Sequence, residues 1–274
     1  MAVELWGAWR AEGKVRDMFD EGRAIGAAYL DMTVRGGGRI VQEDGLGLYF
    51  GTHPSWIIIN GAFRTDPGLA PREAIRRTER AFREVGRTPL LTTFERADAD
   101  LEAALADAGW NAAVELPVMV RSTTLPPDPT PDGAGLEWLA GDDLVELGVL
   151  RDVLLRGYGD GLGEVVDSVF GTNAAVRPPG VAAAIARRDG APAAAALVYV
   201  EGAGAVVAWV ATAPEARRRG LGRFVTAAVT NRGLDLGAAW VTLQASDMGA
   251  PLYRAMGYRD VSMSRVWLAP SPQP

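Results

Sequence analysis

The sequence predicts an α/β (α+β) fold built from two similar halves in tandem. Short apolar segments typical of strands alternate with helical segments along most of the chain. Residues 122–135, STTLPPDPTPDGAG, hold four prolines and two glycines without apolar periodicity, which is typical of an interdomain linker. The elements before this segment repeat, in order, several of the elements after it. We therefore expect a first domain at 1–121, a linker at 122–135 and a second domain at 136–274.

The second half shows the clearer succession of elements. A β-hairpin is indicated by Asp189-Gly190, a dipeptide that favours the tight turn between two strands. Asp142 is a candidate N-cap for the first helix, because its carboxylate can accept from free N–H groups. The expected order is strand 136–139, helix 142–156, helix 164–170, strands 181–188, 193–200 and 205–213, a helix from about 222 to 236, strand 240–244, helix 249–256 and strand 258–268.

The first half can be laid on the second. Pro67 and Gly109 are 42 positions apart, and Pro214 and Gly257 are 43 apart. The expected elements are a strand within 56–67, helix 73–86, strand 90–96, helix 99–110 and strand 112–120. A further helix around 14–29 has no assigned place, and residues 1–35 fit the repeat poorly. The apolar run Trp56, Ile57, Ile58 and Ile59 is expected to be buried on both sides.

Composition excludes several classes of protein. A net charge of −6 over 274 residues argues against general nucleic-acid binding. The absence of cysteine removes disulfides, thiolate metal sites and a cysteine nucleophile, and His53 is the only histidine, so we expect no metal. The most apolar window, 191–214, is interrupted by Glu201 and two glycines, which favours two strands over a membrane helix. We expect a cytoplasmic protein with no membrane or nucleic-acid partner and leave its oligomeric state open.

The segment TAPEARRRGLGRF, residues 212–224, lies between a predicted strand and a predicted helix. A helix N-terminus exposes unpaired N–H groups and attracts anions. Gly220 and Gly222 would let a ligand approach the backbone, and neighbouring arginines supply charge and forked donors for phosphate. The segment lacks the P-loop Gly-Lys-Ser/Thr and the Gly-x-Gly-x-x-Gly of dinucleotide-binding folds. It is a candidate pyrophosphate site, and the alternative is an arginine-rich helix start on a solvated surface.

Two motifs together resemble one family. The pattern Arg-x-x-Gly-x-Gly after a strand ending in Ala213-Pro214-Glu215 resembles motif A of the GNAT (GCN5-related N-acetyltransferase) superfamily. SDMGAPLYRAMGY, 246–258, resembles the second signature of that family. Its Leu252-Tyr253 and Gly257 match directly, whereas Ser246, Gly249 and Tyr258 replace the usual Asn, Ala and Phe. The resemblance covers about residues 136–268 and implies two GNAT-like domains, each a mixed, mostly antiparallel sheet flanked by helices.

The resemblance also implies acetyl-CoA as acyl donor. Tyr253 would protonate the departing thiolate, because a phenol stays protonated at neutral pH; the alternative is a buried aromatic. The positions that would hold the donor are Val210, Ala211 and Thr212 for the pantetheine arm, Arg217 and the backbone amides of Arg218, Arg219, Gly220, Leu221, Gly222 and Arg223 for the pyrophosphate, and Ser246 for a further contact.

The first half lacks these parts. At the motif A position it reads GLAPREA, 68–74, and Leu105 stands where the second half has Tyr253. We expect it to be structural, to bind no CoA, and to shape the acceptor site.

The acceptor is less clearly indicated. Acidic residues concentrated between 137 and 167 could form a rim that attracts a cationic amine, or they could simply be charged helix surfaces. The expected function is acetyl-CoA-dependent transfer of an acetyl group to the amine of a small molecule by direct attack. The alternatives are transfer of another acyl group, or a non-catalytic acyl-CoA-binding or scaffold protein. The acids are Glu137, Asp142, Asp143, Glu146, Asp152, Asp160, Glu164 and Asp167.

Overall fold

The computed structural model describes residues 21–54, 59–127, 129–141 and 143–270. The predicted 14–29 helix is observed from residue 21 onward and continues to 35, while Trp56, Ile57 and Ile58 lie outside the described residues. The first half contains α2 (Glu21–Arg35), β1 (Arg39–Glu43), β2 (Leu46–Phe50), β3 (Asn60–Arg64), α3 (Pro71–Glu84), β4 (Leu90–Phe94), α4 (Glu95–Asp107) and β5 (Asn111–Arg121).

The hairpin of β1 and β2 was missed by the sequence analysis. Its turn contains Asp44 and Gly45, and Gly45 adopts a φ of +79°, a conformation that glycine reaches without steric cost. The signal is the same Asp-Gly dipeptide that indicated the hairpin at Asp189 and Gly190. The flanking strands are short, which explains why periodicity alone did not reveal them.

The predicted elements of the second half are all observed. One detail differs: Asp143 caps α5, its carboxylate accepting from the Val145 N–H at 2.7 Å, whereas Asp142 lies outside the described residues. The elements are β6 (Ala134–Trp138), α5 (Leu144–Tyr158), α6 (Gly163–Val169), β7 (Val181–Arg188), β8 (Ala191–Glu201), β9 (Gly204–Thr212), α7 (Leu221–Asp235), β10 (Trp240–Gln244), α8 (Ala250–Ala255) and β11 (Arg259–Leu268).

The described strands form one continuous sheet in the order β1-β2-β3-β4-β11-β5-β10-β9-β8-β7-β6. The strands of the two halves correspond as β1 to β7, β2 to β8, β3 to β9, β4 to β10 and β5 to β11. When each strand is replaced by its counterpart, the order from β1 to β7 is the same read in either direction. The pairs β3/β4 and β9/β10 are parallel, and the other pairs are antiparallel. The strand order therefore has the approximate two-fold symmetry of a tandem repeat, as predicted.

The repeat predicted from spacing is found at the ends of α4 and α8. Gly109 and Gly257 follow these helices with φ values of +77° and +82°, which suits the left-handed position after a helix. The aromatic residues that follow them, Trp110 and Tyr258, are both buried. By the same symmetry, α2 precedes β1 as the α5–α6 pair precedes β7, which gives the unplaced helix its position in the repeat.

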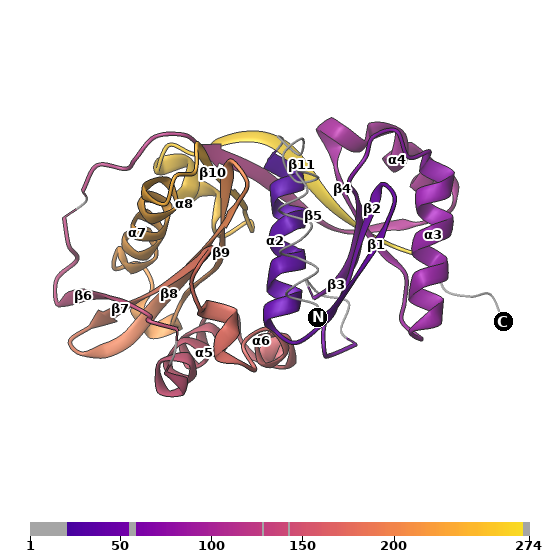
Figure 1. Ribbon diagram of the computed structural model, residues 1–274. Coiled ribbons are helices and arrows are strands. Elements are labelled where there is room, and N and C mark those ends of the chain that lie inside the picture. The colour runs from indigo at the N-terminus through magenta and orange to yellow at the C-terminus, as the bar shows by residue number, and fades with distance from the viewer. Residues whose placement is uncertain (1–20, 55–58, 128, 142, 271–274) are drawn as a thin grey trace.

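The two halves exchange their last strands. β5, which ends the first half, lies between β11 and β10, and β11 lies between β4 and β5. β5 and β11 pair with each other from Arg259–Val120 to Leu268–Asn111, and Figure 1 shows these two long strands crossing between the halves. The Pro-rich connector is anchored on α7, where the Asn231 side chain bonds both the N–H and the carbonyl of Leu125.

Helices cover both faces of the sheet in the second half. Alternate residues of β7 and β8 belong to two different cores: Ala183 and Leu197 pack with α5 and α6, and Ala184 and Ala196 pack with α7. Helix α2 lies between the halves on the same side as α5 and α6 (Figure 1) and contributes Ala24, Ile25, Ala28 and Met32 to their core. No helix among the described residues is long and apolar enough to cross a membrane.

Candidate active site

The loop between β9 and α7 leaves a row of backbone donors unpaired. Helix α7 begins at Leu221 with Gly220 at the N-cap, and no side chain caps it. Within the described part of the chain, the N–H groups of residues 218–222 make no hydrogen bond. Arg218 and Gly220 both have left-handed φ values, +59° and +80°. Free donors at a helix N-terminus are the feature that binds phosphate oxygens.

The glycines of this loop keep space open beside the backbone. A Cβ on Gly222 would lie 3.1 Å from the Thr212 hydroxyl oxygen, and a Cβ on Gly220 would lie 3.4 Å from a ring carbon of Pro131 in the connector. At Gly220 any side chain would also be strained by the positive φ. Both positions therefore favour glycine, and neither places a side chain over the backbone amides of the loop.

The arginines of this loop have different surroundings. Arg217 is half-buried, and its guanidinium donates to the carbonyls of Thr212 at 3.2 Å and Gly157 at 2.8 Å, so it ties the loop to the end of α5. Arg218 and Arg219 are exposed and have no acid within ion-pair distance among the described residues. Arg223 lies in the first turn of α7 and donates to the Ala255 carbonyl at 3.4 Å. Arg218 and Arg219 can therefore meet an anion, whereas Arg217 fixes the shape of the loop.

Strand β9 separates from β10 next to this loop. The two parallel strands pair only from Gly204–Trp240 to Val206–Thr242, although β9 continues to Thr212. A β-bulge opposite Ala196 interrupts the pairing with β8, and Trp209 within it has a φ of +56°. The carbonyl of Val210 accepts a hydrogen bond from the Tyr158 hydroxyl at 3.1 Å. The predicted pantetheine positions therefore lie where β9 has left β10.

A cavity of about 250 Å³ occupies the gap between these strands. Its wall includes Trp209, which meets Tyr158 and Phe170 edge-on at centroid distances of 6.0 and 5.1 Å. The described residues that line it are Ile25, Ala28, Tyr29 and Met32 of α2, Leu116 of β5, Tyr158 of α5, Val206, Val207, Ala208, Trp209 and Val210 of β9, Leu243 and Gln244 of β10, Ser246, and Tyr253 of α8. Helix α2 of the first half thus forms part of the wall of this cavity.

Tyr253 lies in the wall of this cavity, on α8. Its side chain is buried, which raises the pKa of the phenol to about 12. Its ring meets Tyr258 edge-on, and its hydroxyl has no hydrogen-bond partner among the described residues. A phenol with this pKa is protonated at neutral pH and can donate. Ser246 lines the same cavity, and its hydroxyl accepts from the Gly249 N–H at 3.2 Å.

The corresponding loop of the first half has a different structure. Helix α3 begins with Pro71, which has no N–H, and carries Glu73 in its first turn. The N–H groups of Gly68 and Leu69 bond to the side chain and the carbonyl of Asp66. Leu105 is fully buried in α4. Few free donors remain, and a carboxylate stands where a phosphate would need positive charge.

Two features of the site were missed by the sequence analysis. The contribution of α2 could not be predicted because α2 is far from the motifs in sequence, and the bulge at Trp209 has no turn residue to signal it. The predicted acidic rim is not part of the cavity: no carboxylate occurs among its described lining residues. Several of the acids instead pair with Arg187, Arg151, Arg156 and His53. In the part of the chain that the structure describes, no cluster of acids and histidines could hold a metal ion.

Comparison with known proteins agrees with this geometry. Residues 154–258 match the model of the acetyltransferase (GNAT) family. A GCN5-related N-acetyltransferase from Kribbella flavida has a TM-score of 0.71 and 23% identity, over 91% of this chain and 95% of that protein. A tandem GNAT protein from the clavulanic acid biosynthesis pathway has a TM-score of 0.52 and 17% identity, over 73% and 69% of the two chains. A search of curated proteins finds no match.

Residues 154–258 of the second half therefore match a GNAT acetyltransferase domain, and the fold of the chain is similar to that of tandem GNAT proteins.

Proposed function

We propose that the protein transfers the acetyl group of acetyl-CoA to the amine of a small molecule, and that the donor binds only in the second half. The observation that carries this proposal is the row of unpaired N–H groups at 218–222, which lies at the end of the strand that opens beside the cavity. The pyrophosphate would lie on these amides and beside Arg218 and Arg219. Arg217 would hold the loop in place, and Arg223 would stabilise the phosphates from the first helical turn.

The acyl arm would run along β9 toward the cavity. Val210, Ala211 and Thr212 offer backbone groups there, and the carbonyls of Val210 and Thr212 already accept from Tyr158 and Arg217. A carbonyl oxygen has two lone pairs, so each of these can still accept from an amide of the arm. Ser246, which follows β10, and Tyr253 of α8 line the same cavity, and the thioester would lie beside them.

We infer direct attack of the amine on the thioester, because the chain lacks the most reactive nucleophilic side chain. The chain has no cysteine that could form an acyl-enzyme. The amine nitrogen would attack the thioester carbonyl, the carbon–sulfur bond would break, and Tyr253 would give its proton to the departing thiolate. The nitrogen then loses a proton and the products are an amide and CoA. Tyr253 suits this role because its hydroxyl is protonated and has no other described partner.

The first half, 1–121, would serve as a structural domain without a donor site. Its Pro71, Glu73 and Asp66 lie in the loop that corresponds to the proposed donor loop of the second half. Its helix α2 lines the cavity, and its strand β5 pairs with β10 of the second half. In this arrangement 136–274 contains the chemistry, and the connector at 122–135 lies close to the donor loop through Pro131.

Calorimetry with CoA, combined with hydrogen exchange, tests the proposal. We expect one CoA per chain and protection of residues 210–223, with residues 65–74 unchanged. An assay for free thiol should report turnover when an amine is added. Two equal CoA sites, or protection of 65–74, would contradict the assignment of the donor to the second half. Binding without turnover of any amine would support an acyl-CoA-binding role instead.

A further inference from the structure

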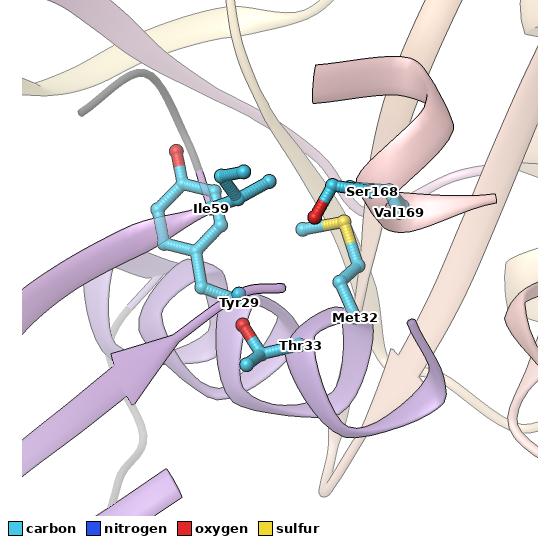
Figure 2. Close-up of a pocket in the computed structure, with 7 residues that line it drawn as sticks. Tyr29, Met32, Thr33, Ile59, Ser168 and Val169 are labelled. Atoms are coloured by element: carbon cyan, nitrogen blue, oxygen red, sulfur yellow. The ribbon is translucent and has the colours of Figure 1, made fainter. Parts of the chain in front are cut away.

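The cavity beside Tyr253 is formed by both halves of the chain. Ile25, Ala28, Tyr29 and Met32 of α2 contribute to one wall, and Trp209 and Leu243 to the other. Tyr29 and Met32 also line a second, smaller pocket, and Figure 2 shows them there projecting from α2, with Met32 directed toward Ser168 and Val169 of α6 and the Tyr29 ring beside Ile59. The indole N–H of Trp209 lies 3.1 Å from the sulfur of Met32, so the two walls are in direct contact.

The walls offer a ligand almost no charge. Among the described lining residues there is no Asp, Glu, Lys, Arg or His. The titratable groups that face the cavity are the phenols of Tyr29, Tyr158 and Tyr253, and burial raises the pKa of Tyr29 and Tyr253, so both stay neutral. An ammonium ion entering here would lose its hydration without gaining a counter-charge, which is strongly unfavourable.

Most of the polar atoms in the walls already have partners. The Tyr29 hydroxyl donates to the Gln244 side chain, and the Gln244 amide donates to the Ser264 hydroxyl at 2.7 Å. The Tyr158 hydroxyl donates to the Val210 carbonyl. The hydroxyls of Tyr253 and Ser246 are the exceptions, since no described residue accepts a hydrogen bond from either. The side chains of the cavity are therefore mostly apolar and aromatic, with two hydroxyl donors at the proposed reaction centre.

The volume of the cavity limits the size of the ligand. Drug-sized ligands occupy pockets of about 300–1,000 Å³, and a cavity of about 150 Å³ holds benzene. A cavity of about 250 Å³ therefore accommodates a single ring and the acyl end of the donor. A polyamine or a sugar amine would bring several charges or hydroxyls into a space that cannot pair them.

We propose, on the basis of the proposed acetyl transfer, that the acceptor is an aromatic amine of one-ring size whose nitrogen carries no proton at neutral pH. Its ring would lie in the cavity against both Met32 of the first half and Trp209 of the second. Its nitrogen lone pair is available without a general base, which agrees with the lack of carboxylate and histidine in the described lining. The nitrogen attacks the thioester carbonyl, the thiolate leaves with the proton of Tyr253, and the proton from nitrogen restores the phenol directly or through water.

Two amines with the same ring test the proposal: 4-methylaniline, which is neutral at pH 7, and 4-methylbenzylamine, which is a cation. We expect kcat/KM at pH 7 to be at least about 100-fold higher for the aniline. The ratio should fall as pH rises toward about 10, the range in which alkyl amines lose their proton. A higher kcat/KM for the benzylamine, or a ratio independent of pH, would overturn the proposal.

Variants of Met32 test whether this wall of the cavity determines the preference for the aniline over the benzylamine. Met32→Glu places a carboxylate in the wall and should lower kcat/KM for the aniline by about 10-fold while raising it for the benzylamine. Met32→Leu, a change of similar volume, should keep the preference of the wild type. Melting temperature and CoA affinity are measured for each variant, and an unchanged preference in a folded Met32→Glu protein would contradict the proposal.

Ligand-observed NMR separates this inference from the proposed function. Binding of 4-methylaniline to the wild-type protein with CoA present supports the cavity assignment, and absence of binding contradicts it. If CoA binds at 210–223 and only cationic amines are acetylated, this inference fails and the proposed function stands. If CoA does not bind at all, the proposed function fails as well.

Discussion

The ring of Tyr253 lies against the backbone of Gly249: a Cβ at Gly249 would stand 2.8 Å from a ring carbon of the tyrosine. Gly249 replaces the alanine that is usual in the second GNAT signature. Restoring it by Gly249→Ala should push the ring away from its place in the cavity wall. We expect kcat to fall roughly 10-fold, because small displacements of a reacting group are costly, with CoA affinity unchanged.

Gly148→Ala is the matched control for that variant. Gly148 is exposed on α5, and a Cβ there would meet no atom within 4 Å. The same substitution should leave kcat unchanged and stabilise the helix by up to about 1 kcal/mol. Steady-state kinetics and thermal unfolding of both variants distinguish the two effects. Equal kcat values for Gly249→Ala and the wild type would show that the position of the ring does not limit the reaction.

Removal of the Tyr253 hydroxyl tests its role as a proton donor. Tyr253→Phe should lower kcat by roughly 10- to 10⁴-fold, the range for a lost general acid, and should leave CoA affinity nearly unchanged. Tyr258→Phe is the control, because the Tyr258 hydroxyl bonds Thr230 at 2.7 Å and lies outside the cavity lining. That variant should lose about 1 kcal/mol of stability and keep its kcat. An unaltered kcat in Tyr253→Phe would assign protonation to water or another group.

The raised pKa of Tyr253 predicts a change of stability with pH. Its phenol has a pKa of about 12 in the folded protein and about 10 when unfolded. The neutral phenol therefore stabilises the fold fully below pH 10, and this contribution is lost as pH rises from 10 to 12. Urea unfolding at these pH values should show a loss that is smaller in Tyr253→Phe, by at most about 3 kcal/mol. Parallel curves for the two proteins would mean that Tyr253 is not buried as described.

Gly220 offers a direct test of the donor site. Gly220→Glu would add a side chain at a φ of +80° and place a negative charge among the free amides of the loop. We expect calorimetry to detect no CoA binding. Gly237→Glu imposes a similar strain at a φ of +100°, beyond the other end of α7 and with no atom within 4 Å of a Cβ. That control should bind CoA as the wild type does; equal weakening in both variants would indicate a general effect on α7.

The parts of the site that were predictable from sequence are those carried by local patterns. Arg218, Gly220 and Tyr253 lie in short motifs that resemble the two GNAT signatures, so their places in the candidate site follow from that resemblance. The wall formed by Met32 could not be predicted, because its contact with Trp209 joins residues 177 positions apart. The exchange of β5 and β11 was equally hidden, since the alternation of a strand is the same whichever neighbour it pairs with. Trp209 shows a third limit: tertiary packing holds it in a conformation that tryptophan does not favour.

The exchanged strands predict that the second half does not function alone. β11 pairs only with β4 and β5, so residues 136–274 would retain β11 without either partner and would expose the edge of β10 that β5 covers. The cavity would also lose α2. At about 25 cal/mol per Å², a loss of contact on the order of several hundred Å² rivals the net stability of a domain, about 5–15 kcal/mol. We expect residues 136–274 expressed alone to be poorly soluble or inactive, although they contain every motif for the donor. The full chain, cut at a protease site inserted within 122–133 after folding, should keep its two pieces together in gel filtration and retain activity. A soluble 136–274 fragment with full acetyltransferase activity would instead show that the first half is an independent module.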